Sequence, residues 1–313
     1  MSTITGTAPA VKHKKKSVMT SKKRNLIAGL LFTSPAILGF LIFSIGPMIA
    51  SLVLSFTDYS VMKETRFVGV ANYSRLIMGV DPFFYQAIKV TLYFVLLNVP
   101  AGIIASFLLA VLLNQKVKGW QFFRIIFYMP TIVPMVATTM IWMWLMSPDF
   151  GLFNTVLQSA GLPTSKWVFG QDSVIPSLVM MAVWTTGSIM VVFLAGLQGI
   201  PGELYEAIEV DGGNVIAKFF HITLPLMTPI IFFNAVMHMI ASIQAFLQAY
   251  IITQGGPNNA SLFYVYYLFR EAFEFQNLGG AFAISWLLFG FVAFCTIIAF
   301  KTSKKWVFYG GDN

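Results

Sequence analysis

Long apolar runs separated by short polar segments make up most of the chain. The first run extends from Leu26 to Leu54. Five more runs cover residues 87–113, 125–146, 174–197, 225–252 and 280–301. A helix of about 20 residues crosses the hydrocarbon core of a bilayer, so each run is long enough to span it. Pro35 and Pro47 should kink the first helix or end it early, because proline lacks a backbone N–H. The pattern predicts an all-α polytopic membrane protein with six transmembrane helices.

The composition agrees with a membrane protein and excludes several other classes. Hydrophobic residues make up 57% of the chain and charged residues 10%, whereas a soluble domain carries about 25% charged residues. The single cysteine, Cys295, lies in an apolar run, so neither a disulfide framework nor a cysteine metal site is expected. The net charge of +8 comes from basic residues that flank apolar runs. We therefore expect membrane lipid, and not nucleic acid, as a partner.

The distribution of basic residues predicts the orientation in the membrane. Six spans place both termini on the same side, and fourteen lysines and arginines fall on that side against six on the other. The positive-inside rule puts the more basic side in the cytoplasm. The sequence thus predicts a basic cytoplasmic tail over residues 1–25, a transmembrane domain over 26–302 and a cytoplasmic C-terminal tail over 303–313. The apolar run behind the N-terminal tail is too long for a signal peptide.

One polar stretch, residues 198–225, interrupts the apolar pattern on the cytoplasmic side. It holds four acidic residues, although a connection between two spans needs only a few residues. The stretch predicts two short helices separated by Asp211-Gly212-Gly213, because two glycines permit a sharp turn. Asn214 can cap the second helix at Val215. In the first helix, Glu203, Glu206 and Ala207 share one face, which leaves room for a partner to approach. An ordinary interhelical loop with solvated acids is the alternative.

The spacing in this stretch resembles the cytoplasmic EAA loop of permease subunits in bacterial ABC importers. Glu206-Ala207-Ile208 is followed after three residues by Gly212, and after nine more by Ile222-Thr223-Leu224-Pro225. Only Ile208 departs from the family pattern, which usually has alanine there. Three further segments resemble sugar-importer permeases in the same order along the chain: 67–73, 148–154 and 253–257. The resemblance covers about residues 26–302 and points to the maltose, glycerol-phosphate and lactose-type first permease of binding-protein-dependent systems.

This resemblance implies a function and a set of partners. It implies the type I ABC importer permease fold in the bacterial cytoplasmic (inner) membrane. The implied partners are a second homologous permease in a heterodimer, two ATP-binding subunits, an extracytoplasmic sugar-binding protein and a sugar or oligosaccharide. No cofactor would be bound by this chain, because ATP and Mg are used by the partner ATPase. The residues implied to couple to that ATPase are Glu206, Ala207, Asp211, Gly212, Gly213, Ile222, Leu224 and Pro225.

No pattern in the sequence indicates catalysis. The chain lacks the Gly-x-x-x-x-Gly-Lys-Ser/Thr phosphate loop, the His-Glu-x-x-His pair and any histidine–carboxylate cluster. We therefore expect a non-catalytic subunit with no catalytic residues and no metal site. The alternative is an ATP-independent secondary carrier for a small polar solute, although carriers coupled to protons usually hold ionisable residues in their spans. A membrane scaffold would leave the polar stretch and the polar residues within the spans unexplained.

Two spans carry neutral polar residues that suit a sugar. In the fifth span, Asn234, His238, Ser242 and Ala245 form one stripe at helical spacing, and the fourth span holds Trp184 to Ser188 near its middle. Such groups bind hydroxyls and stack on sugar faces, but they also join membrane helices to one another. Sugar contacts in maltose-type permeases lie at matching depths in these two spans. The resemblance then selects as the substrate path Trp184, Thr185, Ser188, His238, Ser242 and Gln244.

The segments outside the membrane on the opposite side give weaker patterns. Asn72 starts a short helix, and Leu152 to Leu157 follow helical spacing. Residues 255–259 predict a turn, because they are glycines, proline and asparagines. Trp142 and Trp144 are interpreted as anchors at the membrane interface.

Overall fold

A computed structural model describes residues 21–61, 64–115 and 118–308 of the 313-residue chain. Within these residues the structure is mostly helical and holds no strand, only an isolated bridge between Thr57 and Phe67. The chain divides into two compact units, residues 1–53 and residues 54–313. Most of the predicted N-terminal tail, residues 1–25, lies outside the described residues.

The first unit is one long apolar helix. It comprises α1 (Ser21–Phe40), a five-residue π turn (Leu41–Ile45) and most of α2 (Gly46–Leu54). The helix does not end at Pro35 or at Pro47, so the expectation of an early end is wrong. The π turn comes directly before the turn that holds Pro47, and a widened turn of this kind accommodates a missing backbone donor within a continuous helix.

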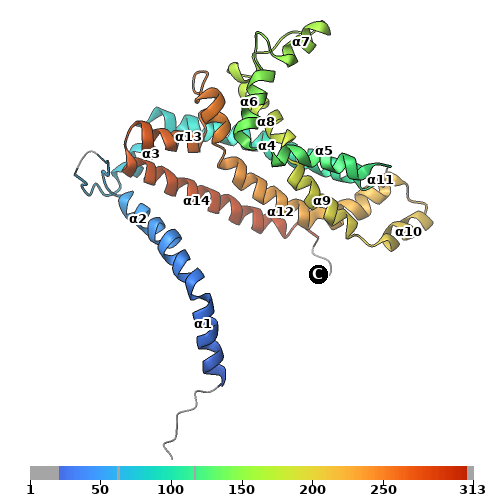
Figure 1. Ribbon diagram of the computed structural model, residues 1–313, viewed down its shortest axis with the longest axis horizontal. Helices are drawn as coiled ribbons and strands as arrows, with labels where there is room; N and C mark the ends of the chain where they lie inside the picture. Colours follow the sequence, from blue (N-terminus) through green and yellow to red (C-terminus); the bar gives the residue numbers. More distant parts are fainter. Residues whose placement is uncertain (1–20, 62–63, 116–117, 309–313) are drawn as a thin grey trace, which may run out of the picture. The chain divides into compact units, whose positions relative to one another are not determined.

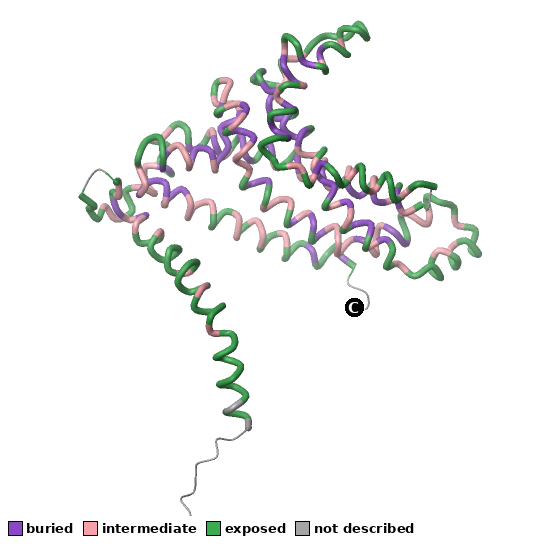
Figure 2. The backbone as a smooth tube through the Cα atoms, viewed as in Figure 1, coloured by how far each residue is buried: buried purple, intermediate pink, exposed green. Residues whose placement is uncertain are grey.

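A central helix, α4 (Pro82–Leu113), organises the second unit (Figure 1). It contacts α8 (Val174–Trp184), α9 (Gly187–Gln198) and α12 (Leu224–Ile243). Asp81 caps its N-terminus by accepting a hydrogen bond of 2.9 Å from the backbone N–H of Phe83. The helix is apolar on all sides, which is typical of a helix surrounded by others. The buried segments in Figure 2 follow α4 and the helices packed on it.

Two apolar clusters lie along α4. One surrounds its N-terminal half and includes Phe94, Leu178 and Tyr267, and the other surrounds its C-terminal half and includes Phe107 and Phe193. Between these two clusters the helix carries Asn98 and Gly102. The polar centre described below therefore lies between two well-packed apolar layers.

Two of the predicted spans are broken helices. The third run forms α5 (Trp120–Ile132) and α6 (Met135–Leu145), bent by 98°, and the fourth forms α8 and α9, bent by 50°. If each bent pair is one span, the described residues hold up to six spans, the predicted number. The expectation of one continuous helix over 125–146 is wrong, because Pro134 forces the preceding residue into an extended conformation.

The fifth and sixth spans differ from each other in their agreement with the sequence pattern. The sixth run forms α14 (Leu278–Ser303) as expected. The fifth helix, α12, follows α11 (Val215–Lys218) and a π turn, and it ends at Ile243 instead of residue 252. Residues 244–246 leave the helix, and a short π turn (Ala249–Thr253) follows them. After α14, Val307 packs on α12 and the backbone N–H of Phe308 donates to Oγ1 of Thr228 at 2.9 Å.

Short helices join the spans at the N-terminal end of α4. The helix predicted at Asn72 is α3 (Ala71–Ile77), and the Asn72 side chain donates to the carbonyls of Ser55 and Thr57. Beyond α3, Arg75 bonds Glu271 at 3.1 Å. Tyr267 in α13 (Tyr264–Phe269) donates to Asp81 at 2.7 Å, and burial raises the pKa of its hydroxyl. These bonds tie α3, α4 and α13 together at one end of the unit.

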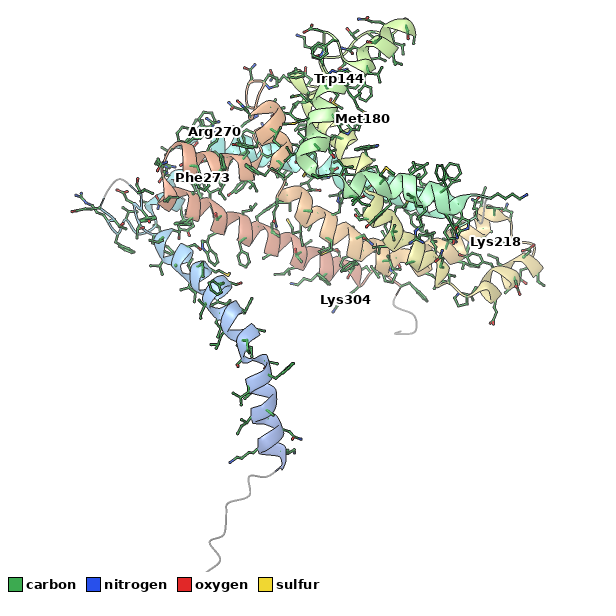
Figure 3. All side chains as sticks on the ribbon, viewed as in Figure 1. Trp144, Met180, Lys218, Arg270, Phe273 and Lys304 are labelled. Carbon is green, nitrogen blue, oxygen red and sulfur yellow. The ribbon has the colours of Figure 1, made fainter. Side chains whose placement is uncertain are left out.

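The helix predicted at Leu152 is α7 (Leu152–Ser159). Its Phe153 packs edge-to-face on Trp142, which is only 8% exposed. The interpretation of Trp142 as an interface anchor is therefore wrong, because the ring is enclosed by aromatic neighbours. Trp144, labelled in Figure 3, is 57% exposed. The turn predicted at 255–259 is present.

Candidate functional site

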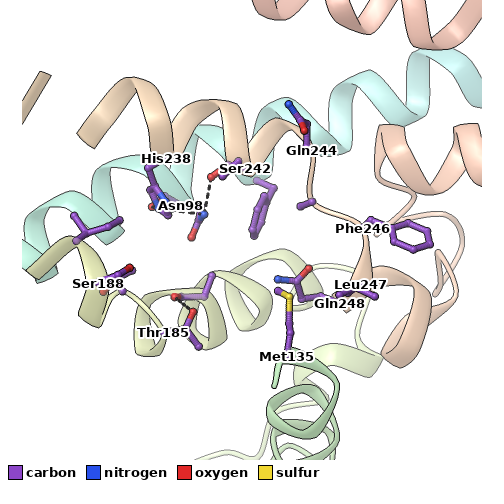
Figure 4. A pocket seen from close by; sticks show the side chains of 16 residues that line it. Asn98, Met135, Thr185, Ser188, His238, Ser242, Gln244, Phe246, Leu247 and Gln248 are labelled. Atoms are coloured by element: carbon purple, nitrogen blue, oxygen red, sulfur yellow. Dashed lines mark hydrogen bonds between the residues drawn. The ribbon is translucent and has the colours of Figure 1, made fainter. Parts of the chain in front are cut away.

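Three helix breaks meet at one cavity of about 370 Å³. The break between α8 and α9 contributes Thr185 and Thr186, the start of α6 contributes Met135, and the segment after α12 contributes Gln244 to Gln248. Non-helical backbone is tolerated at membrane depth only inside protein or beside a water-filled space. The cavity walls, drawn in Figure 4, are formed by Phe94, Asn98, Met135, Ala182, Thr185, Thr186, Ser188, Ile189, His238, Ala241, Ser242, Gln244, Ala245, Phe246, Leu247 and Gln248.

One polar cluster on the cavity wall joins α4 to α12. Nδ2 of Asn98 donates to Oγ of Ser242 at 2.8 Å. Nε2 of His238 lies 3.3 Å from the carbonyl oxygen of Asn98 and 3.4 Å from its Nδ2, and the histidine tautomer decides which bond forms. The two helices approach closely here, because a Cβ at Gly102 would stand 2.5 Å from Nε2 of His238. Glycine is therefore required one turn beyond Asn98.

A second cavity of about 230 Å³ adjoins the first and shares four of its lining residues: Met135, Ala182, Thr185 and Gln248. It lies against the break between α5 and α6, where Pro130, Val133 and Thr138 line it. Among the described residues, none that lines either cavity is Asp, Glu, Lys or Arg. The two cavities together form a continuous uncharged space beside both broken spans.

Five of the six predicted substrate-path residues line the first cavity: Thr185, Ser188, His238, Ser242 and Gln244. The structure places Trp184 elsewhere, packed edge-to-face on Trp142 with ring centroids 5.8 Å apart. Asn234, which shares the predicted stripe, does not line the cavity, and it donates to the carbonyl of Ile230 one turn back. That these residues contact a solute stays a prediction.

The sequence interpretation missed Asn98, Thr138 and Gln248. Asn98 is a lone amide in the apolar second run, so the criterion applied to the fourth and fifth runs would have found it. Gln248 gave no comparable signal, because the fifth run reads as a helix beyond residue 243 and would have placed its side chain on another face. Only the break after Ile243 brings Gln248 to the cavity.

Close contacts hold α9 against its neighbours around the cavity. A Cβ at Gly187 would collide with the backbone carbonyl of Phe127 in α5. A Cβ at Gly196 would collide with the side chain of Ile230 in α12. Small residues let membrane helices pack with their backbones close together. The position of α9 between α5 and α12 therefore depends on these glycines.

The polar stretch forms the predicted pair of short helices. These are α10 (Gly202–Val210) and α11, and Asn214 caps α11 by accepting from the N–H of Ala217 at 2.9 Å. Gly212 has φ +82°, a conformation that side chains disfavour, so glycine is required at this turn. The N–H of Gly213 donates to the carbonyl of Ile208 at 2.7 Å. The predicted cap and turn are confirmed.

Two side-chain bonds brace the stretch internally. Nζ of Lys218, labelled in Figure 3, bonds Oε2 of Glu209 at 2.6 Å. This hydrogen bond and the charge of Lys218 hold the pKa of Glu209 below its usual value. The hydroxyls of Tyr205 and Thr223 lie 3.0 Å apart, which joins α10 to the π turn before α12. The stretch is thus fixed to the helix that carries His238 and Ser242.

The predicted coupling residues divide into an exposed part and an anchoring part. Glu206, Ala207, Asp211 and Gly212 are exposed, Gly213 is half-buried, and Ile222, Leu224 and Pro225 are buried or half-buried at the start of α12. Large apolar side chains near the turn are exposed as well: Val210, Val215, Ile216 and Phe220. Exposed apolar groups beside exposed acids are typical of a surface that contacts another protein. Coupling through these residues stays a prediction.

The part of the chain that the structure describes holds no group of three or more His, Cys, Asp or Glu residues placed to bind a metal. His221 bonds the carbonyl of Ala217 at 3.0 Å within its own helical segment.

Comparisons with known proteins agree on one family. Residues 98–306 match the model of the family described as binding-protein-dependent transport system inner membrane component. The probable ABC transporter permease protein YesP of Bacillus subtilis is 40% identical over 98% of both chains. The arabinooligosaccharides transport system permease protein AraP of Halalkalibacterium halodurans is 32% identical over 88% of both chains.

A solved structure has the same fold. A chain of a bacterial alginate ABC transporter, crystallised with a periplasmic protein that holds an alginate pentasaccharide, superposes with a TM-score of 0.79. It is 23% identical, and the match covers 91% of this chain and 96% of that one. The matched family segment contains the broken spans, the cavity and the braced stretch. The chain therefore belongs to the inner membrane components of binding-protein-dependent transport systems, the permease subunits of ABC transporters.

Proposed function

We propose that this chain is the membrane-spanning subunit of an ATP-driven importer of a sugar or oligosaccharide. The observation that carries the proposal is the convergence of three helix breaks on one uncharged polar cavity. Neutral hydroxyl and amide groups bind sugar hydroxyls, and the ring of Phe246 offers a face to sugar C–H groups. The relative named for arabinooligosaccharides supports this class of solute.

The chain forms half of the translocation path, and a second, homologous permease forms the other half. An extracytoplasmic binding protein delivers the sugar, and two ATP-binding subunits supply the energy. ATP and Mg stay on those subunits, because the described residues offer no metal site. The basic side of the chain, with both termini and the stretch 198–225, faces the cytoplasm.

The stretch 198–225 transmits the movement of the ATP-binding subunits. Helix α10 sits in a cleft on one of them, and the exposed Glu206 meets a basic group there. When the two subunits close on ATP, α10 moves as a rigid lever, because the bonds Tyr205–Thr223 and Glu209–Lys218 fix it to the start of α12. Helix α12 carries His238 and Ser242, so its movement opens the cavity outward. Hydrolysis then returns it to the inward-open state.

The second candidate is a secondary carrier that works without an ATPase. Broken membrane helices at the solute site are typical of such carriers, and two broken spans are present here. The feature is common to both classes, whereas the family match favours the importer. Purification separates them, because the importer requires a second permease and ATP-binding subunits that copurify with this chain.

The coupling proposal is tested with Glu206→Ala in the complete importer. We expect the variant to assemble but to lose most uptake, because α10 then lacks the carboxylate that engages the ATPase. Uptake into vesicles and ATP hydrolysis are measured together. Glu64→Ala, a change at an exposed glutamate outside the stretch, is the matched control. Normal uptake and normal ATP hydrolysis in Glu206→Ala would contradict the proposal, and so would uptake by the isolated chain without ATP.

A further inference from the structure

Three buried polar atoms along the two cavities lack a hydrogen-bond partner. They are Oδ1 of Asn98, Oε1 of Gln248 and Oγ1 of Thr138. The three residues are 3%, 7% and 3% exposed. Asn98 lines the first cavity, Thr138 lines the second, and Gln248 lines both. The unpartnered atoms therefore follow the continuous space from α4 to α6.

The donor capacity of Asn98 is already used inside the protein. Its Nδ2 donates to Ser242, so the atom left for a ligand is the acceptor Oδ1. The free atom of Gln248 is also an amide oxygen, which accepts and cannot donate. Figure 4 shows Gln248 beside Met135, on a different wall from Asn98 and Ser242. A ligand that satisfies both walls must bring hydrogen-bond donors on more than one side.

Charge narrows the class of ligand further. A carboxylate or phosphate only accepts hydrogen bonds, so it would face amide oxygens with no cation to balance it. An ammonium could donate, but none of the described lining residues carries a negative charge. Burying an unpaired charge is costly in either case. Hydroxyl groups donate without charge, and several of them on one ring can reach several walls.

We propose that this permease takes an uncharged, hydroxyl-rich saccharide and excludes acidic ones, with Asn98, Gln248 and Thr138 as the residues that select it. The proposal rests on the proposed importer function and specifies its substrate class. The similar solved transporter imports the acidic polysaccharide alginate, so the shared fold does not decide the charge of the solute. The cavity of about 370 Å³ lies near the small end of the range for ligand pockets, roughly 300–1,000 Å³. Water satisfies the free oxygens when the solute is absent.

The test uses the complete importer with its binding protein and ATP-binding subunits in membrane vesicles. The probes are radiolabelled neutral disaccharides, each paired with its uronate, in which one hydroxymethyl group is oxidised to a carboxylate. The variants are Asn98→Leu, Gln248→Leu and Thr138→Val, which keep the size of the side chain and remove the free oxygen. The matched control is Asn234→Leu, because Asn234 is a buried amide in α12 that bonds its own helix and lines neither cavity.

We expect uptake of a neutral probe and no uptake of its uronate. Each variant should lower neutral uptake roughly three- to tenfold, the range for one net hydrogen bond, while Asn234→Leu lowers it far less. If Asn98→Leu does not assemble, Gln248→Leu and Thr138→Val decide, because the free oxygen in each has no partner to lose.

Other results overturn the proposal in separable ways. Uptake of a uronate in preference to its neutral partner would refute the substrate class and leave the importer function standing. Neutral uptake that is equal in the three variants and in the control would show that the free oxygens bind only water. ATP-dependent assembly with no uptake of any saccharide would refute the proposed function itself.

Discussion

The cavity and the stretch 198–225 are both polar interruptions of an apolar protein, but they are built in opposite ways. The bonds that shape the stretch join residues 3 to 18 positions apart in the sequence. The bonds that shape the cavity join residues 140 and 144 positions apart. The stretch is a local structure that presents its side chains outward, and the cavity exists only where several helices meet. Changes in one should therefore alter the engagement of a partner, and changes in the other should alter the choice of solute.

The largest effect is expected from Gly187→Ala. The added Cβ collides with the backbone of α5, so α9 must move away and the breaks around the cavity separate. We expect a loss of about 1–3 kcal/mol in the free energy of unfolding and loss of uptake. Thermal unfolding of the purified importer measures the first. Gly290→Ala is the control, because a Cβ at that helical position meets nothing within 4 Å. Equal unfolding midpoints for the two variants would contradict the close approach.

The next effect is expected from Gly212→Ala, which changes the stretch alone. Alanine at φ +82° costs about 1–2 kcal/mol, so the turn between α10 and α11 relaxes and the lever loses its bend. We expect uptake to fall while the preference among solutes is unchanged. Uptake of two competing sugars is measured in one assay. In the control, Gly202→Ala, the new Cβ stands in open space. A changed solute preference in Gly212→Ala would break the separation between the two regions.

A smaller effect is expected from Tyr205→Phe, which removes the hydroxyl that joins α10 to Thr223. The lost hydrogen bond is worth about 0.5–1.5 kcal/mol, so we expect a several-fold lower uptake for each ATP hydrolysed. The Thr223→Val change should have a similar effect, and combining the two should add little, because both remove the same bond. Additive losses in the double variant would show that the two hydroxyls act independently.

The smallest effect is expected from Lys218→Gln. The Lys218 hydrogen bond lowers the pKa of Glu209 from its ordinary value of 4.5, and we expect the pKa to rise toward that value in the variant. In the parent protein the pair stabilises the stretch at pH values above 4.5. The contribution is lost as the pH falls through the lowered pKa of the folded state. The side-chain carbon shift of Glu209, followed by NMR against pH, gives both values. An unchanged pKa would show that the bond does not form in solution.

Much of the fold and of the stretch could be predicted from the sequence, because those features depend on neighbouring residues. Apolar length predicts the six candidate spans, and spacing alone predicts the cap at Asn214 and the turn at Gly212. The cavity could be predicted only in part. His238 and Ser242 stand out as polar residues in apolar runs, whereas Trp184 was assigned by depth and lies against Trp142 instead.

The sequence by itself determined that the chain is a helical membrane protein, which segments cross the bilayer, and the local form of its acidic stretch. Periodicity, proline, glycine and capping residues act over a few positions, so their consequences can be predicted without tertiary structure. Only the tertiary structure decided where the helices break and that three breaks meet beside Asn98. Whether a polar side chain in a span is satisfied depends on atoms from distant helices. Hence the free oxygens of Asn98, Gln248 and Thr138 become recognisable only once those helices are packed together.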